Sequence, residues 1–293
     1  MKKVLIVGLG SIGKKHLNAA LNLKCQIDVI SKHTVNSENF QLIKNLTHDK
    51  TYDLGIICSV TSSHISDLLK IHKYCRTILV EKPIYHKKIS PQLKLRLDKI
   101  NSLIILGFNL RYLEILIFLK KYLINKKIIK VENVFWDDSR KWYAGRDFEK
   151  LYVSNKSLGG GSLLTNIHEL DYVKFICNSE IIKLKKSFQK NKDYEVDESC
   201  IVEGFLENGT SFKSSLNIFS SVRERKGFIL TSNEKIKWNL DKGIVTSNTS
   251  GLIFNNKTNY IKSYTDQLKY ILENKFDNVS SLESNIKLNN LIF

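Results

Sequence analysis

A glycine-rich segment directly behind a short apolar run constrains this chain most. The run Val4 to Val7 precedes a Gly-x-Gly-x-x-Gly motif at residues 8–13, and a helix-compatible stretch follows from Lys14. In a strand–turn–helix unit the first glycine permits a tight turn, the second lets a pyrophosphate approach the backbone, and the third lets the helix pack on the strand. The positive end of that helix favours an anion. We therefore expect a dinucleotide to bind at Gly8, Gly10, Ser11, Ile12 and Gly13; a plain turn of small residues is the alternative.

The residues after the second expected strand indicate which dinucleotide binds. That strand covers residues 26–30, and NAD-selective proteins usually carry an acidic residue close to its end. Here the chain continues with Ser31, Lys32 and His33. A hydroxyl and an amine suit a 2′-phosphate, so NADP is favoured over NAD. A strand shifted by a few residues would instead bring Asp28 to this position, and Lys32 as a solvated loop lysine is the alternative.

Length and composition bound the class of protein. The 293 residues suffice for two domains, and 42% hydrophobic with 26% charged residues is ordinary for a globular protein. A formal net charge of +17 invites comparison with nucleic-acid binders. The lysines are dispersed, however, and no basic stretch alternates with aromatic residues as single-strand binding requires. We expect no nucleic-acid partner, and a charge that steers an anionic cofactor and substrate instead.

Cysteine usage and the apolar segments bear on the compartment. The five cysteines are widely spaced without a Cys-x-x-Cys pair, which fits reduced thiols better than disulfides or a metal site. The apolar run at the N-terminus is too short for a signal peptide. Charged residues interrupt the most apolar stretch, residues 103–123, so it does not predict a membrane span. We expect a cytoplasmic protein with no metal and no membrane contact.

The order of expected elements predicts two domains. Up to about residue 118 short strands alternate with helical segments, as in the βαβ units of a parallel sheet. The strands expected in this part cover residues 3–7, 26–30, 54–58, 77–80 and 104–107. Beyond it we expect a strand at 129–136, a helix at 162–176, strands at 199–206, 211–219, 227–231, 235–240 and 243–246, and helices at 259–275 and 281–293. An Asn-Gly pair predicts a hairpin turn at 207–210. The fold class is α/β, with domain 1–118 followed by an α+β domain at 119–293 on a mostly antiparallel sheet.

Glu81-Lys82-Pro83 follows the fourth expected strand. A lysine at the carboxyl end of a parallel strand lies at the edge where open α/β sheets bind ligands, and the proline restricts the backbone there. Such a lysine can hydrogen-bond a reacting hydroxyl or carbonyl oxygen and share in moving its proton. A surface lysine before a turn is the alternative.

A second candidate group lies on the helix expected at 162–176. Thr165, His168 and Asp171 are spaced three apart and share one helix face, and the three glycines at 159–161 permit a close approach of a ligand. A histidine, with an ordinary pKa of about 6.5, can accept a hydroxyl proton while hydride leaves the same carbon. A core histidine with satisfied hydrogen bonds is the alternative.

Aromatic and charged residues gather ahead of the glycines. They are Trp136, Asp137, Asp138, Arg140, Trp142, Tyr143, Arg146 and Tyr152. This mixture suits the face of a sugar together with a carboxylate or phosphate. An ordered loop held by its aromatic rings is the alternative.

Taken in order, these motifs resemble the Gfo/Idh/MocA family of sugar and polyol oxidoreductases along nearly the whole chain. Residues 59–64 resemble the family's loop that meets the cofactor, although Val60 replaces the usual proline. Residues 107–112 resemble its hinge, and residues 159–172 resemble the turn and helix that carry its catalytic histidine. The resemblance implies a Rossmann domain, an NAD(P)-dependent dehydrogenase or reductase acting on CH-OH groups of a sugar-type substrate, and a homodimer or homotetramer formed through the exposed face of the C-terminal sheet.

The resemblance also implies roles for individual residues. The expected catalytic residues are Lys82 and His168. The cofactor is expected to contact Ser31, Lys32, His33, Ser59, Thr61, His64, Glu81 and Lys82 besides the glycine loop. The substrate is expected to contact Arg111, Tyr143, Arg146, Thr165, Asn166 and Asp171.

One departure from the family pattern leaves the activity open. Many members carry an aspartate three or four residues before the histidine, where this chain has Thr165 and Leu164. Either Asp171 or Glu169 substitutes for it, or Lys82 carries more of the proton transfer, or turnover is lost. A non-catalytic dinucleotide-binding or regulatory protein is therefore the alternative function. Residues 154–158 and those after His168 resemble a branch associated with bacterial surface-glycan or nonulosonic-acid pathways.

Overall fold

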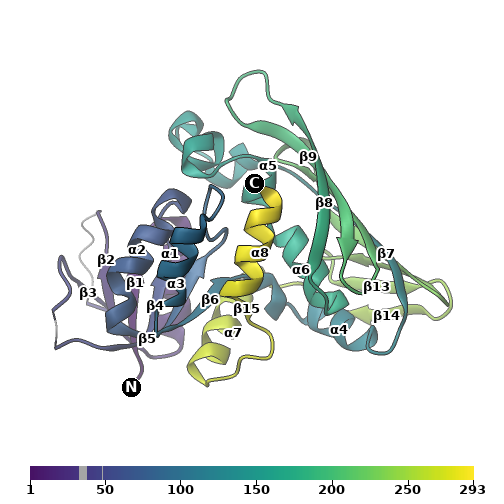
Figure 1. Ribbon diagram of the computed structural model, residues 1–293. Helices are drawn as coiled ribbons and strands as arrows, with labels where there is room; N and C mark the ends of the chain where they lie inside the picture. The colour runs from purple at the N-terminus through teal and green to yellow at the C-terminus, as the bar shows by residue number, and fades with distance from the viewer. Residues whose placement is uncertain (33–37, 48) are drawn as a thin grey trace. The chain divides into compact units, whose positions relative to one another are not determined.

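The computed structural model describes residues 1–32, 38–47 and 49–293, so the expectation for His33 lies outside the described residues. The chain forms two compact units (Figure 1). The first unit comprises Met1–Tyr112, Tyr260–Leu291 and Phe293, and the second comprises Leu113–Asn259 and Ile292.

A parallel sheet forms the centre of the first unit. Its strand order is β15-β6-β5-β4-β1-β2-β3, and only β15 runs antiparallel to its neighbour. The strands are β1 (Lys3–Val7), β2 (Gln26–Ile30), β3 (Gln41–Leu42), β4 (Tyr52–Ile57), β5 (Cys75–Glu81), β6 (Leu103–Gly107) and β15 (Ser280–Ser281). The five expected strands are confirmed to within two residues at each end. Two-residue strands such as β3 and β15 are too short to produce a periodic pattern.

Helices cover both faces of this sheet. They are α1 (Ser11–Asn22), α2 (His64–Ile71), α3 (Pro91–Asp98), α7 (Tyr260–Leu272) and α8 (Leu282–Ile292). Val4 and Ile6 of β1 point into the core shared with α1 and α7. On the other face, α2 approaches β4 so closely that a Cβ on Gly55 would lie 3.0 Å from Ile71.

The C-terminal helices pack with the first unit, whereas the sequence grouped residues 119–293 together. Leu268 and Ile271 of α7 belong to the same buried cluster as α1 and the parallel strands. These helices carry apolar stripes that any sheet could cover, and the sequence pattern does not identify which sheet does so. The boundary at residues 118 and 119 stays a prediction.

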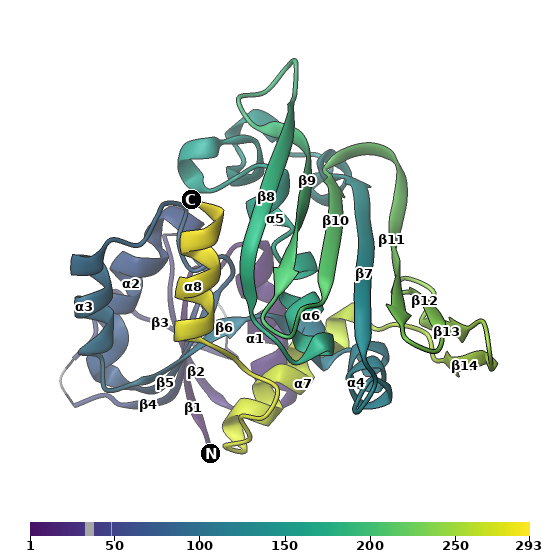
Figure 2. The ribbon, with the colours of Figure 1, turned by 45° about the vertical axis from the view of Figure 1, so that its right-hand side comes forward.

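The second unit contains a broad, mostly antiparallel sheet. Figure 2 shows β8, β9, β10, β7 and β11 side by side within the order β14-β13-β12-β11-β7-β10-β9-β8, in which only β10 and β7 are parallel. The strands are β7 (Ile128–Asp138), β8 (Ile181–Lys190), β9 (Asp197–Leu206), β10 (Ser211–Asn217), β11 (Phe219–Thr231), β12 (Lys235–Asn239), β13 (Ile244–Ser247) and β14 (Gly251–Asn255). Its α-helices are α4 (Glu114–Tyr122), α5 (Ser162–Thr165) and α6 (His168–Cys177). The predicted α/β class with a second, mostly antiparallel sheet is confirmed.

Several expected elements in this unit differ from the observed ones. Strands β8 and β14, which form the two edges of the sheet, were not among the expected elements. In β8 only Ile181 is buried and lysines are frequent, so the strand lacks the alternation of a half-buried strand and has the charged character of an edge. β11 is one strand of 13 residues with a register shift between Phe219 and Glu224, whereas the expected strand covered only residues 227–231.

The expected helix at 162–176 is two helices. α5 ends at Thr165 and α6 begins at His168, with Asn166 outside helical geometry at φ −109° and ψ 26°. The predicted hairpin turn at 207–210 is present between β9 and β10, and Gly209 is the residue with a left-handed φ of 84°. Among the described residues, no helix is both long enough and apolar enough to cross a bilayer.

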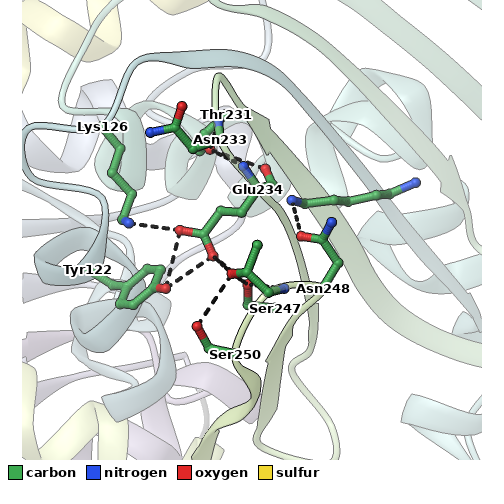
Figure 3. A network of polar contacts seen from close by, with 10 residues as sticks. Tyr122, Lys126, Thr231, Asn233, Glu234, Ser247, Asn248 and Ser250 are labelled. Atoms are coloured by element: carbon green, nitrogen blue, oxygen red, sulfur yellow. Dashed lines mark hydrogen bonds and ion pairs between the residues drawn. The ribbon is translucent and has the colours of Figure 1, made fainter.

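A buried carboxylate anchors the turn between β11 and β12 to helix α4 (Figure 3). Glu234 accepts hydrogen bonds from Lys126 Nζ at 2.7 Å and from the Tyr122 hydroxyl at 3.1 Å, and the Ser247 hydroxyl donates to it as well. Burial by itself would raise the pKa of Glu234, but the hydrogen bonds from Lys126, Ser247 and Tyr122 outweigh it and lower the pKa. The network therefore holds a charged carboxylate in the second unit.

Candidate functional site

The glycine loop between β1 and α1 has the geometry that the sequence predicts. Gly8 adopts a φ of 94° and its N–H donates to the Ile30 carbonyl at 2.8 Å. A Cβ on Gly13 would lie 2.1 Å from the Gly8 carbonyl oxygen, so only glycine lets the helix begin against the turn. The loop is tightly packed on the side that faces the protein.

Gly10 faces open space instead. An added Cβ there would meet nothing within 4 Å. Helix α1 begins at Ser11 without a capping side chain, and its first turn carries no acidic residue. The first amides of a helix bind anions when no side chain occupies them. The start of α1 therefore fits a pyrophosphate that approaches the backbone at Gly10.

Two further loops reach the same edge of the sheet. β1, β4 and β5 are parallel neighbours, so the segments after Val7, Ile57 and Glu81 emerge side by side at their carboxyl ends. A Cβ on Gly8 would lie 2.8 Å from the backbone nitrogen of Ser59, which shows how close two of these loops are. Ligands bind at this edge in open α/β sheets. The structure thus brings together the glycine loop, the loop at 59–64 and Lys82.

Ser59 and Thr61, both expected at the cofactor, lie in the loop after β4. Thr61 is buried, and the Ser59 hydroxyl is buried without a hydrogen-bond partner among the described residues. Because buried hydroxyls in native proteins are nearly always hydrogen-bonded, this oxygen fits a ligand that supplies the partner. The residues around the loop therefore fit a dinucleotide.

His64 ties this loop to the segment after β5. Its Nδ1 lies 2.8 Å from the Pro83 carbonyl oxygen and its Nε2 lies 2.9 Å from the Ser59 carbonyl oxygen. A neutral imidazole has one N–H and donates to one of these oxygens at a time. Burial lowers the pKa of His64, while the two carbonyls and Glu81 oppose the shift. Both ring nitrogens are thus engaged with the backbone, and cofactor contact by His64 stays a prediction.

The carboxylate of Asp28 points toward the amino-terminal ends of the strands, away from the end of the sheet that carries the glycine loop. It accepts hydrogen bonds from the Tyr52 hydroxyl at 2.7 Å and from Lys50 Nζ at 2.8 Å, at the beginning of β4. The observed β2 ends at Ile30, so Ser31 and Lys32 directly follow its carboxyl end. Asp28 is therefore not at the position of a ribose-binding acid. This removes the alternative in which a shifted strand brings Asp28 to the cofactor.

Lys82 directly follows β5, and its peptide bond to Pro83 is cis. The adjacent Glu81 is buried; its Oε1 lies 2.8 Å from His16 Nε2, and its Oε2 accepts the Lys82 backbone N–H at 3.2 Å. His16 was not among the residues expected at the site. The available signal was its position three residues after Gly13, on the same face of α1.

Arg111 has a structural partner in the first unit. It is buried, and its Nη1 donates to the Val279 carbonyl oxygen at 2.7 Å. This bond holds the turn between α7 and β15. Substrate contact by Arg111 stays a prediction, and nothing in this geometry requires it.

In the second unit the triple glycine leads into α5. Gly161 has a φ of 99°, and a Cβ on it would lie 2.6 Å from Asp197 Oδ1. The Asp197 carboxylate accepts the Ser162 backbone N–H at 2.7 Å and also the Ser162 hydroxyl. A carboxylate from the start of β9 thus caps this short helix and fixes the turn that leads to His168.

The polar residues expected on this turn lie close together in the chain but not on one continuous helix. Thr165 ends α5, Asn166 lies in the break, and His168 begins α6. Asn166 is buried and its amide nitrogen has no hydrogen-bond partner among the described residues. His168 is half-buried and Asp171, one turn later, is buried. An unsatisfied buried amide at this break fits a polar ligand.

Glu169 is committed to a different network. Its carboxylate accepts hydrogen bonds from Arg225 Nε at 2.8 Å and from Asn133 Nδ2 at 3.1 Å, and Asn133 also donates to the Tyr172 hydroxyl at 2.7 Å. The Arg225 guanidinium lies over the Phe135 ring, 4.5 Å from its centroid. This network fastens α6 to the sheet, which argues against Glu169 as the substitute for the missing aspartate.

The aromatic segment before the glycines is held by its own polar contacts. The Trp142 indole donates to Asp137 at 2.7 Å, and Arg140 forms a bidentate pair with Asp138 at 2.8 and 2.9 Å. Tyr143 is half-buried and Arg146 is exposed. Burial raises the pKa of Tyr143, and a hydrogen bond with Tyr152 opposes that shift. Substrate contact by Tyr143 and Arg146 stays a prediction.

Comparison with known proteins agrees with this architecture, although no protein-family profile matches the chain. Glucose-6-phosphate 3-dehydrogenase of Bacillus subtilis is 24% identical over 245 residues, which cover 75% of this chain and 68% of the relative. The structure of GenD2 from gentamicin A biosynthesis, in complex with NAD, matches with a TM-score of 0.78 at 14% identity over 99% of this chain and 92% of GenD2.

The chain has the Gfo/Idh/MocA-type oxidoreductase fold. A third match within this fold is a super-repressor mutant of Gal80p from Saccharomyces cerevisiae, with a TM-score of 0.80 at 14% identity over 99% of this chain and 96% of Gal80p. The same fold therefore occurs in GenD2, solved in complex with NAD, and in a mutant of Gal80p that is described as a super-repressor.

Proposed function

We propose that the protein is an NAD(P)-dependent oxidoreductase that transfers a hydride between a nicotinamide cofactor and a hydroxyl or keto carbon of a sugar or sugar derivative. The observation that carries this proposal is the uncapped start of α1 beside the open position at Gly10, at the same sheet edge as Lys82. The relative named glucose-6-phosphate 3-dehydrogenase supports a sugar substrate.

The chain's own residues suggest how each part acts. Bound nicotinamide would supply the hydride acceptor or donor. The backbone at Gly10 and the α1 amides hold the pyrophosphate, and Ser31 and Lys32 hold a 2′-phosphate, which favours NADP over NAD. Lys82 hydrogen-bonds the reacting oxygen, and His168 accepts or returns its proton. Asp171, on the same helix, is the carboxylate we assign to support His168.

Substrate identity and assembly belong to the same proposal. The proposed substrate contacts are Thr165, Asn166, Tyr143 and Arg146. The Asn166 amide nitrogen, buried without a partner among the described residues, supports this proposal. We also propose a cytoplasmic homodimer or homotetramer formed through the open face of the second sheet, and a place in bacterial surface-glycan or nonulosonic-acid synthesis.

The first experiment is a titration of the purified protein with NADPH and with NADH, followed by nicotinamide fluorescence. We expect binding of both and tighter binding of NADPH. Turnover is then measured with glucose 6-phosphate and with a panel of free and phosphorylated sugars. Failure to bind either nucleotide would contradict the proposal at its first step.

Substitution of the proposed catalytic residues distinguishes an enzyme from a binding protein. We expect Lys82→Met and His168→Asn each to lower kcat by about a thousandfold while leaving nucleotide affinity unchanged, because each removes a proton-transfer group rather than a pyrophosphate contact. The control is Lys94→Met, at an exposed lysine of α3. Unchanged turnover in both variants would show that other residues do the chemistry.

A non-catalytic dinucleotide-binding or regulatory protein is the second candidate. Thr165 and Leu164 replace the carboxylate expected before His168, and one matched structure is that of a super-repressor mutant of Gal80p. This candidate predicts nucleotide binding without turnover of any sugar, and equal nucleotide affinity in wild type, Lys82→Met and His168→Asn.

A further inference from the structure

His16 connects the helix of the glycine loop to the segment that carries Lys82. It is fully buried in α1, and its Nε2 lies 2.8 Å from Glu81 Oε1. Because a carboxylate only accepts hydrogen bonds, Nε2 carries the proton of this contact. The hydrogen bond therefore joins helix α1, which follows the glycine loop, to the end of β5.

Glu81 is also hydrogen-bonded to Lys82. Its second oxygen accepts the Lys82 backbone N–H at 3.2 Å. The adjacent strand leaves room for the carboxylate only because residue 107 is glycine, since a Cβ there would lie 2.9 Å from Glu81 Cδ and Oε1. The carboxylate is thus held from three sides, by the His16 ring, by its own chain and by β6.

The surroundings of His16 are not those of an ordinary packing residue. Its Nδ1 is buried without a hydrogen-bond partner among the described residues. The His16 ring contacts the Tyr264 ring edge to face, with 5.1 Å between their centroids. Lys15 Nζ lies 5.4 Å from the centroid of the same Tyr264 ring. An unsatisfied buried nitrogen destabilises the folded protein, and an apolar side chain at this position would avoid that cost. The imidazole therefore needs a role that a leucine could not fill.

We propose that His16 is a positioning residue that, through Glu81, fixes Lys82 relative to the dinucleotide bound at α1. The inference rests on the proposed function for the role of Lys82. Reacting groups displaced by about 1 Å lose about a hundredfold in rate, so a rigid link between the cofactor helix and the lysine has a direct catalytic consequence. A residue that acts only in folding would not change the accessibility of Lys82 beside the bound nucleotide.

The test measures labelling of Lys82 by an amine-reactive acylating reagent, with and without saturating NADH, by mass spectrometry. Exposed Lys94 of α3 is the internal reference. In wild type we expect NADH to slow the labelling of Lys82. In His16→Leu we expect the Kd for NADH to stay within about threefold of wild type, because the glycine loop is intact, while most of the protection of Lys82 is lost.

Two further variants keep the result interpretable if His16→Leu folds poorly. His16→Gln can still donate a hydrogen bond to Glu81, so we expect it to restore protection. Glu81→Gln presents an amide instead of two acceptor oxygens, and we expect it to lose protection to the same extent as His16→Leu, with no further loss in the double variant. His72→Leu, at a half-buried histidine after α2, is the matched control and should resemble wild type.

Each outcome decides one claim. Full protection of Lys82 in His16→Leu or in Glu81→Gln, each binding NADH, overturns the inference and leaves the proposed function intact. Additive losses in the double variant also overturn it, because independent contributions would mean that Glu81 does not transmit the effect of His16. Failure of the wild type to bind NADH and NADPH overturns the proposed function itself.

Discussion

Glu81 in the first unit and Glu234 in the second are both buried carboxylates, with 6% and 8% of their surface exposed, but their surroundings differ. Glu234 is surrounded by side-chain donors: Tyr122 of α4, Ser247 of β13 and the ammonium of Lys126 in the turn after α4. Among the residues that the structure describes, Glu81 has one side-chain hydrogen bond, to His16, and one hydrogen bond to the backbone of the next residue.

This difference separates an anchor from a positioning element. A carboxylate with several donors, one of them charged, stabilises the fold, because each bond to a charged group is worth about 1.5–3 kcal/mol. A carboxylate held mainly by one imidazole and one amide contributes less to stability, but it fixes the orientation of the two groups that it joins. Glu81 adjoins Lys82, whereas Glu234 lies at a turn between β11 and β12. The same residue type therefore serves packing in one unit and geometry in the other.

Substitution of Gly107 by alanine should produce the largest loss of stability. It tests whether the Glu81 carboxylate is held in place. The new Cβ would lie 2.9 Å from the Glu81 carboxylate, which lies against its own backbone and His16. We expect a loss of about 3 kcal/mol of unfolding free energy, at the upper end for an overpacked site. Thermal melting of the full chain measures it.

Gly10→Ala is the matched control for that variant. Its Cβ would meet nothing within 4 Å, so stability should stay within about 0.5 kcal/mol of wild type while NADH binding weakens. A Gly107→Ala protein as stable as wild type would show that the Glu81 carboxylate is free to move, and the positioning role would lose its basis.

Glu234→Gln tests the other side of the comparison. The variant loses the charged acceptor of Lys126 and one acceptor oxygen, and we expect about 2 kcal/mol of destabilisation with no change in NADH affinity. The control is Glu203→Gln, in an exposed pair with Lys213, which should cost less than about 1 kcal/mol. If both variants melt together with wild type, Glu234 is not an anchor.

The smallest expected effect is the pH dependence of the stability difference between wild type and Glu234→Gln. The pKa of Glu234 is lowered in the folded protein, so its contribution is present above the pKa of an unfolded glutamate, about 4.3, and is lost as the pH falls through the folded value. The difference in unfolding free energy between wild type and Glu234→Gln should therefore be constant near neutral pH and shrink as the pH falls below the pKa of an unfolded glutamate. A difference that grows on acidification would contradict the sign of the shift.

Much of the first unit could be predicted from sequence because its signals are local. Buried parallel strands appear as apolar runs, and Gly8, Gly10 and Gly13 are required by a turn whose geometry is the same wherever it occurs. The position of Lys82 follows from the end of β5 in the same way. The exposed edge strand β8 and the break at Asn166 gave no such signal, because lysine-rich edges and helix interruptions depend on what packs beside them.

The sequence by itself determined the two-sheet architecture, the glycine loop and the candidate residues Lys82 and His168, because these depend on periodicity and on residue types at fixed spacing. Only the tertiary structure decided which partners the polar residues have. It turned Asp28 toward Tyr52, committed Glu169 to Arg225 and joined His16 to Glu81, 65 residues apart. Hydrogen bonds between distant residues depend on how strands and helices are assembled in space, and that information is not contained in any local stretch of the chain.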